Sequence, residues 1–151
     1  MEYANEMELI FDSRSENEGF ARVAVAAFMT QMNPVLEEVS DVKTAVSEAV
    51  TNSIIHGYDG GEGKIRIHCG ICEHDLYIEV VDEGIGILDV SKAMEPLFTT
   101  KPDLDRSGMG FAFMEAFMDE VTVESAPGEG TCVKMKKSVG KGLEAWTTQS
   151  L

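Results

Sequence analysis

The sequence predicts an α+β fold, a two-layer α/β sandwich in which a mixed, mostly antiparallel sheet carries helices on one face. The chain has 151 residues, of which 44% are hydrophobic, enough for one domain with a sizeable core. Segments with helical periodicity and segments with strand-like alternation occur in groups and do not alternate strictly along the chain. Two pairs of alternating segments are joined by short turn sequences, as in antiparallel hairpins.

The alternating segments are the expected strands. They cover residues 8–13, 64–71, 76–81, 120–125 and 130–136. Glu73-His-Asp75 separates the second segment from the third, and Ala126-Pro-Gly-Glu129 separates the fourth from the fifth. Both separators are typical turn sequences, so two antiparallel hairpins are predicted.

The first helix is expected between the first two strands. Ser15 or Asn17 can cap its start, and it runs to about Met32, where Asn33-Pro34 ends it. Helical spacing predicts that one apolar face is buried. Its members are Phe20, Val23, Ala24, Ala27 and Phe28.

The second helix, from about Glu37 or Asp41 to Tyr58, carries the pattern around which the chain is organised. Glu48, Asn52 and His56 are spaced by four and form a polar stripe along one side. Because unpaired buried polar groups cost free energy, a carboxylate and a carboxamide beside an apolar arc need an explanation, and an exposed polar edge with ordinary hydrogen bonds is one that the pattern alone leaves open. The arc expected to be buried consists of Val42, Ala45, Val46, Ala49, Val50 and Ser53.

Two glycine-punctuated stretches follow. Asp82-Glu-Gly84-Ile-Gly86 comes directly after an apolar strand, and Ser107-Gly108-Met-Gly110 directly precedes a helix-like run from Met109 to Met118. Residues 84–107 between them contain only a short helical run at 90–94. Long segments of this kind inside compact domains are usually lids or binding loops.

Composition excludes several classes of protein. The net charge of −15 argues against direct nucleic-acid binding and suits a partner with basic surfaces, although solubility alone would also explain it. The sequence shows no signal peptide and no apolar run of membrane-spanning length, so a cytoplasmic protein that does not enter a membrane is expected. We expect one domain over residues 1–139 and a loose tail over 140–151.

The three cysteines form no disulfide framework. Cys69 and Cys72 spell C-x-x-C, but residues three apart on a strand point to opposite faces. No second cysteine pair completes a four-ligand zinc site, so a metal or redox role is not expected.

The ordered set of motifs resembles the N, G1 and G2 boxes of the GHKL ATPase and kinase superfamily. Over residues 7–138 it resembles more closely the anti-sigma F factors of spore-forming bacteria. The stretches that carry this are 44–52 with His56-Gly-Tyr58, Pro96-Leu-Phe-Thr-Thr-Lys-Pro102 and Arg106-Ser-Gly-Met-Gly-Phe111. The resemblance implies the Bergerat-type nucleotide fold, ATP or ADP with Mg²⁺ as cofactors, and a homodimer.

The resemblance also implies roles for single residues. Glu48 is expected to be the general base that accepts the proton of an attacking hydroxyl, and Asn52 the Mg²⁺ ligand. Asp82 is expected to bind the exocyclic amine of adenine, with Gly84 and Gly86 allowing close approach to base and ribose. The expected phosphate contacts are Thr99, Thr100, Lys101, Arg106, Ser107, Gly108, Met109 and Gly110, with Lys101 and Arg106 also explicable as solvated loop charges.

The function implied is that of an anti-sigma factor and protein-serine kinase. It would inhibit a sporulation sigma factor of the sigma F type and phosphorylate a serine on an anti-anti-sigma protein, and Arg22 on the first helix would contact both partners. Two alternatives stay open: an anti-sigma kinase of the general-stress type, and a sigma-sequestering module that binds ATP without efficient transfer. The ATPase domain of a sensor kinase, gyrase or MutL-type machine needs an appended domain for which the chain is too short.

Overall fold

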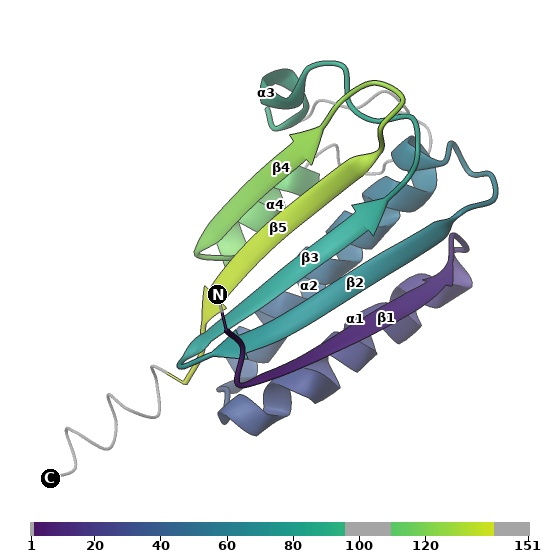
Figure 1. Ribbon diagram of the computed structural model, residues 1–151. Coiled ribbons are helices and arrows are strands. Elements are labelled where there is room, and N and C mark those ends of the chain that lie inside the picture. Colours follow the sequence, from purple (N-terminus) through teal and green to yellow (C-terminus); the bar gives the residue numbers. More distant parts are fainter. Residues whose placement is uncertain (1, 96–109, 141–151) are drawn as a thin grey trace, which may run out of the picture.

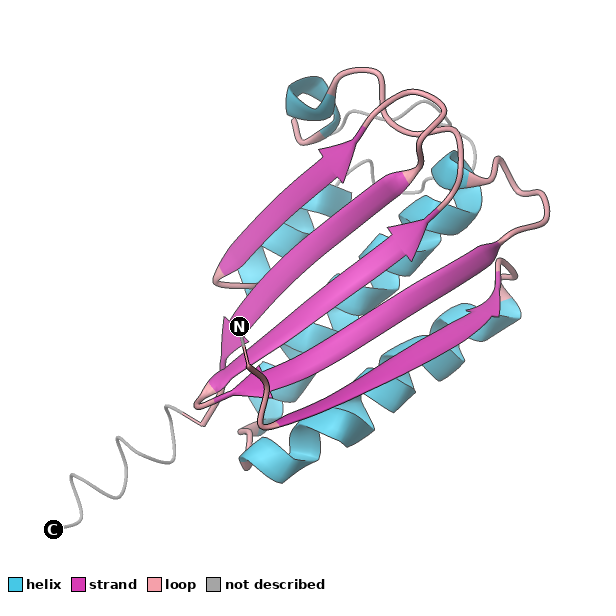
Figure 2. Ribbon diagram, viewed as in Figure 1, coloured by secondary structure: helices cyan, strands magenta, loops and turns pink. Residues whose placement is uncertain are grey.

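A five-stranded sheet with helices on one face forms the molecule in the computed structural model, which describes residues 2–95 and 110–140 (Figures 1 and 2). The strands lie in the order β1-β2-β3-β5-β4, and each of the four pairings is antiparallel. The strands are β1 (Asn5–Asp12), β2 (Lys64–Cys72), β3 (Asp75–Asp82), β4 (Glu120–Ser125) and β5 (Thr131–Ser138). The predicted fold class and both hairpins are confirmed, but the sheet of the described residues is entirely antiparallel and not mixed as expected.

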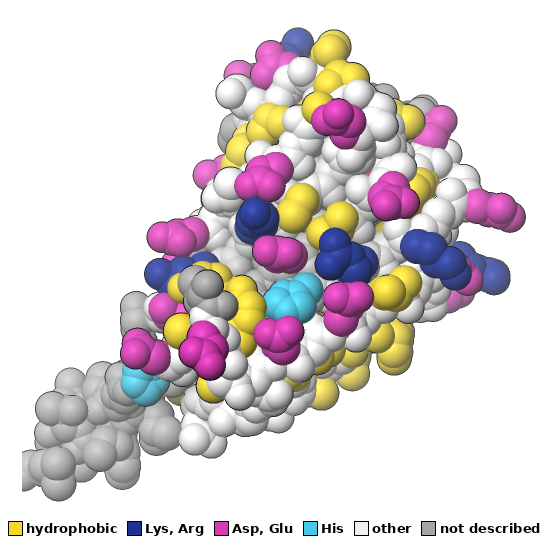
Figure 3. Space-filling view, viewed as in Figure 1, with side chains coloured by type: hydrophobic (Ala, Val, Ile, Leu, Met, Phe, Trp, Pro, Cys, Tyr) yellow, Lys and Arg dark blue, Asp and Glu magenta, His cyan; other side chains and the backbone are white. Residues whose placement is uncertain are grey.

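The two faces of the sheet differ because side chains alternate along each strand. On β2 and β3 the inward positions, such as Ile67 and Ile78, are fully buried against the helices. The outward positions carry charges that pair across strands, as in Lys134 with Glu124, whose Nζ and Oε1 atoms are 3.1 Å apart. Figure 3 views this outward face, where acidic and basic side chains are interspersed.

Helix α1 (Glu16–Met29) continues into a 3₁₀ turn, η1 (Thr30–Met32), and ends at Asn33 in the left-handed region. The end of the helix is therefore as expected. Ser15 occupies the N-cap position, but its side chain makes no capping hydrogen bond.

The predicted apolar face of α1 is wrong except at Phe28, which packs partly buried against the core. The buried residues are Ala21, Val25 and Met29, whereas Phe20 and Val23 are each 55% exposed. Apolar residues occur all around this helix, so periodicity alone does not select a face. Packing against α2 selects the face that carries the small Ala21.

Helix α2 (Leu36–Asn52) lies under the middle of the sheet, and its entire predicted arc from Val42 to Ser53 is buried. After Asn52 the helix changes to a π turn, η2 (Ser53–Gly57). At the other end, Glu38 is only 8% exposed and accepts hydrogen bonds from the Val35 amide at 2.9 Å and the Gly140 amide at 3.1 Å. Glu38 thereby joins the start of α2 to the chain that follows β5.

Two shorter helices complete the described structure. Helix α3 (Val90–Ala93) and helix α4 (Gly110–Phe117) match the predicted helical runs to within a residue or two. Within residues 2–95 and 110–140, no helix has the length and apolar character needed to span a bilayer. Cys69 is buried and Cys72 half-buried on β2, three residues apart. The tail prediction concerns residues that, except for Gly140, lie outside the described part.

Candidate functional site

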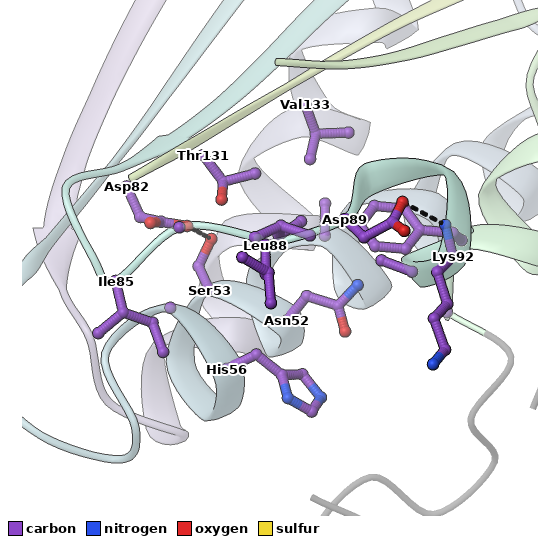
Figure 4. A pocket seen from close by; sticks show the side chains of 17 residues that line it. Asn52, Ser53, His56, Asp82, Ile85, Leu88, Asp89, Lys92, Thr131 and Val133 are labelled. Carbon is purple, nitrogen blue, oxygen red and sulfur yellow. Dashed lines mark hydrogen bonds between the residues drawn. The ribbon is translucent and has the colours of Figure 1, made fainter. Parts of the chain in front are cut away.

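A cavity of about 350 Å³ opens where the end of α2, the loop after β3 and the start of α4 meet. Figure 4 shows Asn52 and His56 on the helical side, Asp82 and Thr131 on the sheet side, and Leu88 and Asp89 from the loop. The volume is in the usual range for small-molecule sites. The lining residues are Ala49, Asn52, Ser53, His56, Gly57, Asp82, Ile85, Gly86, Ile87, Leu88, Asp89, Lys92, Ala93, Gly110, Phe111, Thr131 and Val133.

Asp82 is the buried acidic group of this cavity and is only 4% exposed. Its carboxylate accepts hydrogen bonds from the Ser53 hydroxyl at 2.7 Å and the Gly84 amide at 3.0 Å. Burial raises the pKa of Asp82, while hydrogen bonds from Ser53 and the Gly84 and Thr131 backbone act in the opposite direction. The group is thus a fixed acceptor at the edge of a largely apolar cavity.

The start of α4 lies against the polar stripe of α2. A Cβ atom added to Gly110 would be 3.1 Å from Asn52 Nδ2 and 3.3 Å from Glu48 Oε2. A side chain at residue 110 would therefore press on the carboxamide and the carboxylate, and both would have to shift by a few tenths of an ångström. This contact brings Glu48, Asn52 and Gly110 together; helical spacing placed the first two on one stripe, and the family resemblance implied that Gly110 belongs to the same site.

The two glycines after Asp82 have a structural reason that the sequence did not supply. A Cβ atom at Gly84 would be 2.1 Å from the Gly57 carbonyl oxygen, and one at Gly86 would be 2.0 Å from the Ala126 carbonyl oxygen. Gly86 also has a φ of +77°, which favours glycine. Both residues therefore let the loop pack against the protein's own backbone, and Gly86 in addition lines the cavity.

The predicted site residues divide into three groups. Asn52, Asp82, Gly86 and Gly110 line the cavity, while Glu48 and Gly84 lie beside it. Arg22 lies on α1, half-exposed, with its Nη1 atom 3.3 Å from Glu18 Oε1, and Glu18 also accepts a hydrogen bond from Ser47 of α2. The predicted phosphate contacts Thr99, Thr100, Lys101, Arg106, Ser107, Gly108 and Met109 lie outside the described residues.

Sequence reasoning missed several residues that line the cavity. Ser53 was assigned only to the buried arc, although a buried hydroxyl requires a partner and this was a usable signal. Thr131 pairs with Asp82 across β3 and β5, a neighbour relation that requires the strand order. Lys92 brings a cation to the cavity, and α3 positions it through the N-cap bond from its amide to Asp89.

The metal-ligating atoms of the site suit a metal ion that is bound together with a phosphate-bearing ligand. Among the residues that the structure describes, no group of three His, Cys, Asp or Glu side chains could hold a metal ion by themselves. Mg²⁺ usually takes only one or two oxygen ligands from a protein and the rest from phosphates and water. The carboxamide oxygen of Asn52 is suited to that role.

The chain matches a family model described as the histidine kinase-like ATPase domain over residues 11–137. It is 60% identical to the anti-sigma F factor of Clostridium botulinum strain Eklund 17B over 136 residues, which cover 89% of this chain and 95% of that protein. It is 58% identical to the anti-sigma F factor of Thermoanaerobacter sp. strain X514 over 140 residues, covering 93% and 98%.

Solved structures share the fold. The RsbU and RsbW domains of a Mycobacterium tuberculosis protein match with a TM-score of 0.65 and 17% identity, over 90% of this chain and 33% of that one. The catalytic domain of the histidine kinase ThkA matches with a TM-score of 0.55 and 17% identity, over 89% and 96%. Full-length ShkA in complex with AMPPNP matches with a TM-score of 0.55 and 14% identity, over 81% and 30%.

Proposed function

The chain belongs to the anti-sigma F factors within the histidine kinase-like ATPase family, and on this premise we propose that it is an ATP-dependent protein-serine kinase that also sequesters a sigma factor. Its targets would be a sigma factor of the sigma F type and an anti-anti-sigma protein that receives the phosphate on a serine. The observation that carries the proposal is the contact of Gly110 with both Glu48 and Asn52 beside the cavity.

ATP or ADP would occupy the cavity with its base near Asp82. An ionised acceptor held by Ser53 and Gly84 suits the exocyclic amine of adenine, because a buried carboxylate needs donors. The apolar walls suit the faces of a purine. Gly110, at the start of α4, would face the phosphates.

Two residues of α2 would have separate roles in transfer. The oxygen of Asn52 would hold Mg²⁺, which when bound neutralises phosphate charge and orients the phosphates for in-line attack. Glu48, one helical turn earlier, would accept the proton of the substrate serine hydroxyl. The packing of Gly110 against both side chains would hold Glu48 and Asn52 at a fixed distance from each other.

Arg22 would be the contact shared by both protein partners. Its side chain is 43% exposed and is held by Glu18 on the same helix, so a guanidinium is presented at a defined place. One arginine cannot serve two partners at once, so sigma factor and anti-anti-sigma protein would exclude each other. Arg22→Glu should weaken both complexes while ATP affinity stays unchanged.

A homodimer would cover the apolar surface that α1 leaves exposed. Phe20, Val23 and Ile10 of β1 are each more than half exposed, and apolar side chains gather along this edge in Figure 3. β1 is also an edge strand of eight residues, a feature that proteins usually cover or protect. Val23→Glu should shift the protein to a monomer in analytical ultracentrifugation.

The test of the proposed function is transfer of labelled phosphate from ATP to a small anti-anti-sigma protein, followed by phosphoamino-acid analysis. Phosphoserine is expected with the wild type. Glu48→Gln should lower single-turnover transfer by about 10²–10⁴-fold, because the basic charge is lost, and should change Mg·ATP affinity much less. Glu37→Gln, an exposed glutamate of the same helix, is the matched control.

The other outcomes separate the alternatives. Transfer by Glu48→Gln within about threefold of the wild type would remove Glu48 from the base role and leave positioning and metal electrostatics as the main effects. Absence of phosphoserine with intact sigma binding would favour the sequestering module. Transfer to a general-stress antagonist in preference to a sporulation one would favour the general-stress type.

A further inference from the structure

The stretch His56-Gly57-Tyr58 begins four residues after Asn52, the position proposed to bind the metal. Tyr58 does not line the cavity, yet it is half-buried beside it. Its phenol oxygen donates to the Lys64 carbonyl and accepts a hydrogen bond from the Glu83 amide at 2.8 Å. Tyr58 therefore connects the end of α2, the start of β2 and the residue that follows Asp82.

The ring of Tyr58 is held in place by close packing. A Cβ atom added to Gly63 would be 2.3 Å from the ring, so the ring packs closely against the backbone that leads into β2. The phenol is thus held by packing on one side and by two hydrogen bonds at its tip. A group held in this way can fix the position of the Glu83 amide.

Gly57 contacts the chain at the end of β3, residues 82–85, which we call the 82–85 corner. Its carbonyl oxygen accepts a hydrogen bond from the Ile85 amide at 2.8 Å, and Gly84 packs directly on it. A Cβ atom on Gly57 would be 3.0 Å from the carboxylate atoms of Asp82. The π turn thereby places Gly57 against the acceptor and the corner, and π turns of this kind are frequent at functional sites.

We propose that Gly57 and Tyr58 are positioning residues that fix Asp82 and the 82–85 corner, and that they thereby set the preference of the site for adenine over a 6-oxopurine. The inference rests on the proposed binding of ATP. Adenine offers an amine to the carboxylate, whereas hypoxanthine offers an oxygen that the carboxylate repels. The preference depends on an exact placement of the acceptor, because a displaced acceptor loses the bond to the amine.

The experiment measures the affinities of the full-length protein for Mg·ATP and Mg·ITP by titration calorimetry. Tyr58→Phe removes only the hydroxyl and should weaken ATP binding by about three- to tenfold, while ITP binding changes less than twofold. The ratio of the two affinities should fall accordingly. Tyr77→Phe is the matched control, because Tyr77 lies on the outward face of the sheet and contacts Tyr3.

A second variant changes the 82–85 corner and leaves the Tyr58 hydroxyl in place. Gly57→Ala should displace the Asp82 carboxylate and lower the ATP-to-ITP ratio in the same direction. Gly19→Ala on α1 is its control, because a Cβ atom there meets nothing within 4 Å. Urea unfolding of each variant separates misfolding from a change in the site, and two variants keep the test informative if one fails to fold.

The results have distinct meanings. Equal losses of ATP and ITP affinity, or an unchanged ratio in both folded variants, would overturn the positioning roles. A wild-type protein that binds neither nucleotide would instead contradict the proposed function itself. A lowered ratio in Tyr58→Phe and Gly57→Ala, with both controls unchanged, is the expected result.

Discussion

Two buried carboxylates lie at opposite ends of α2, and they have different surroundings. Glu38, in the first turn, accepts hydrogen bonds from the amides of Val35 and Gly140. Asp82, beside the last turn, accepts from Ser53 and Gly84 and also borders the cavity. The first carboxylate is enclosed by the protein's own chain, whereas the second keeps a side facing a space that a ligand can enter.

The difference shows that burial of a charged group does not by itself identify a functional site. Both side chains are less than 9% exposed. What separates them is the nature of the neighbours, because amides from distant parts of the chain make Glu38 a structural junction. The cavity wall makes Asp82 a group that can bind a ligand. Four predictions test this contrast.

The largest effect is expected for Asp82→Asn. The carboxamide replaces an ionised acceptor, so ATP affinity should fall by about 10- to 100-fold, the usual range for a charge-assisted hydrogen bond. The free energy of unfolding should not fall. Calorimetric titration with Mg·ATP measures the first quantity and urea unfolding the second, with exposed Asp12→Asn as control. Unchanged ATP affinity would mean that Asp82 is as structural as Glu38.

Glu38→Ala should have the opposite effects, a loss of stability without a loss of ATP affinity. It leaves two amides without their acceptor and should lower the free energy of unfolding by about 2–3 kcal/mol. ATP affinity should stay within about twofold of the wild type. Glu37→Ala, its exposed neighbour, should change stability by less than about 0.5 kcal/mol. A loss of nucleotide binding in folded Glu38→Ala would show that the two ends of α2 are coupled.

Ser53→Ala sharpens the contrast with a smaller change. The variant removes one of the hydrogen bonds to the Asp82 carboxylate and keeps the carboxylate itself. We expect ATP affinity to fall by about three- to fivefold, less than for Asp82→Asn. Ser40→Ala, an exposed serine of α2, serves as control. A loss as large as that of Asp82→Asn would indicate that Ser53 has its own contact with the ligand.

The smallest effect is a dependence of stability on pH. Burial raises the pKa of Asp82, so the folded protein binds this proton at a higher pH than the unfolded chain does. Its contribution to stability is therefore present at low pH and is lost as the pH rises through the folded-state pKa. Urea unfolding between pH 7 and pH 4.5 should show wild type gaining stability relative to Asp82→Asn as the pH falls. A constant difference would contradict the raised pKa.

Much of the fold follows from local sequence patterns. The buried arc of α2 was predictable because each apolar position recurs at helical spacing between polar ones. The face of α1 was not, because Phe20 and Val23 are apolar and still point away from the core. The choice depends on where α2 packs, and a single helix carries no information about that.

The candidate site was predictable in part. Glu48, Asn52 and Asp82 were identified through the family resemblance, since E-x-x-x-N alone is common on helix surfaces. The bond from Ser53 to Asp82 spans 29 residues, and that from Gly140 to Glu38 spans 102. Contacts over such separations follow from strand order and layer packing, which no local pattern specifies.

The position of β5 has a consequence for biosynthesis. β5 is the last strand of the described residues, yet it lies between β3 and β4 in the sheet. A growing polypeptide that has not passed Ser138 lacks the strand with which both neighbours pair, as well as Thr131 and Val133 of the cavity wall. Ribosomes must therefore deliver nearly the whole described domain before the sheet can close, and a nascent chain that stops earlier has no complete pocket for a nucleotide.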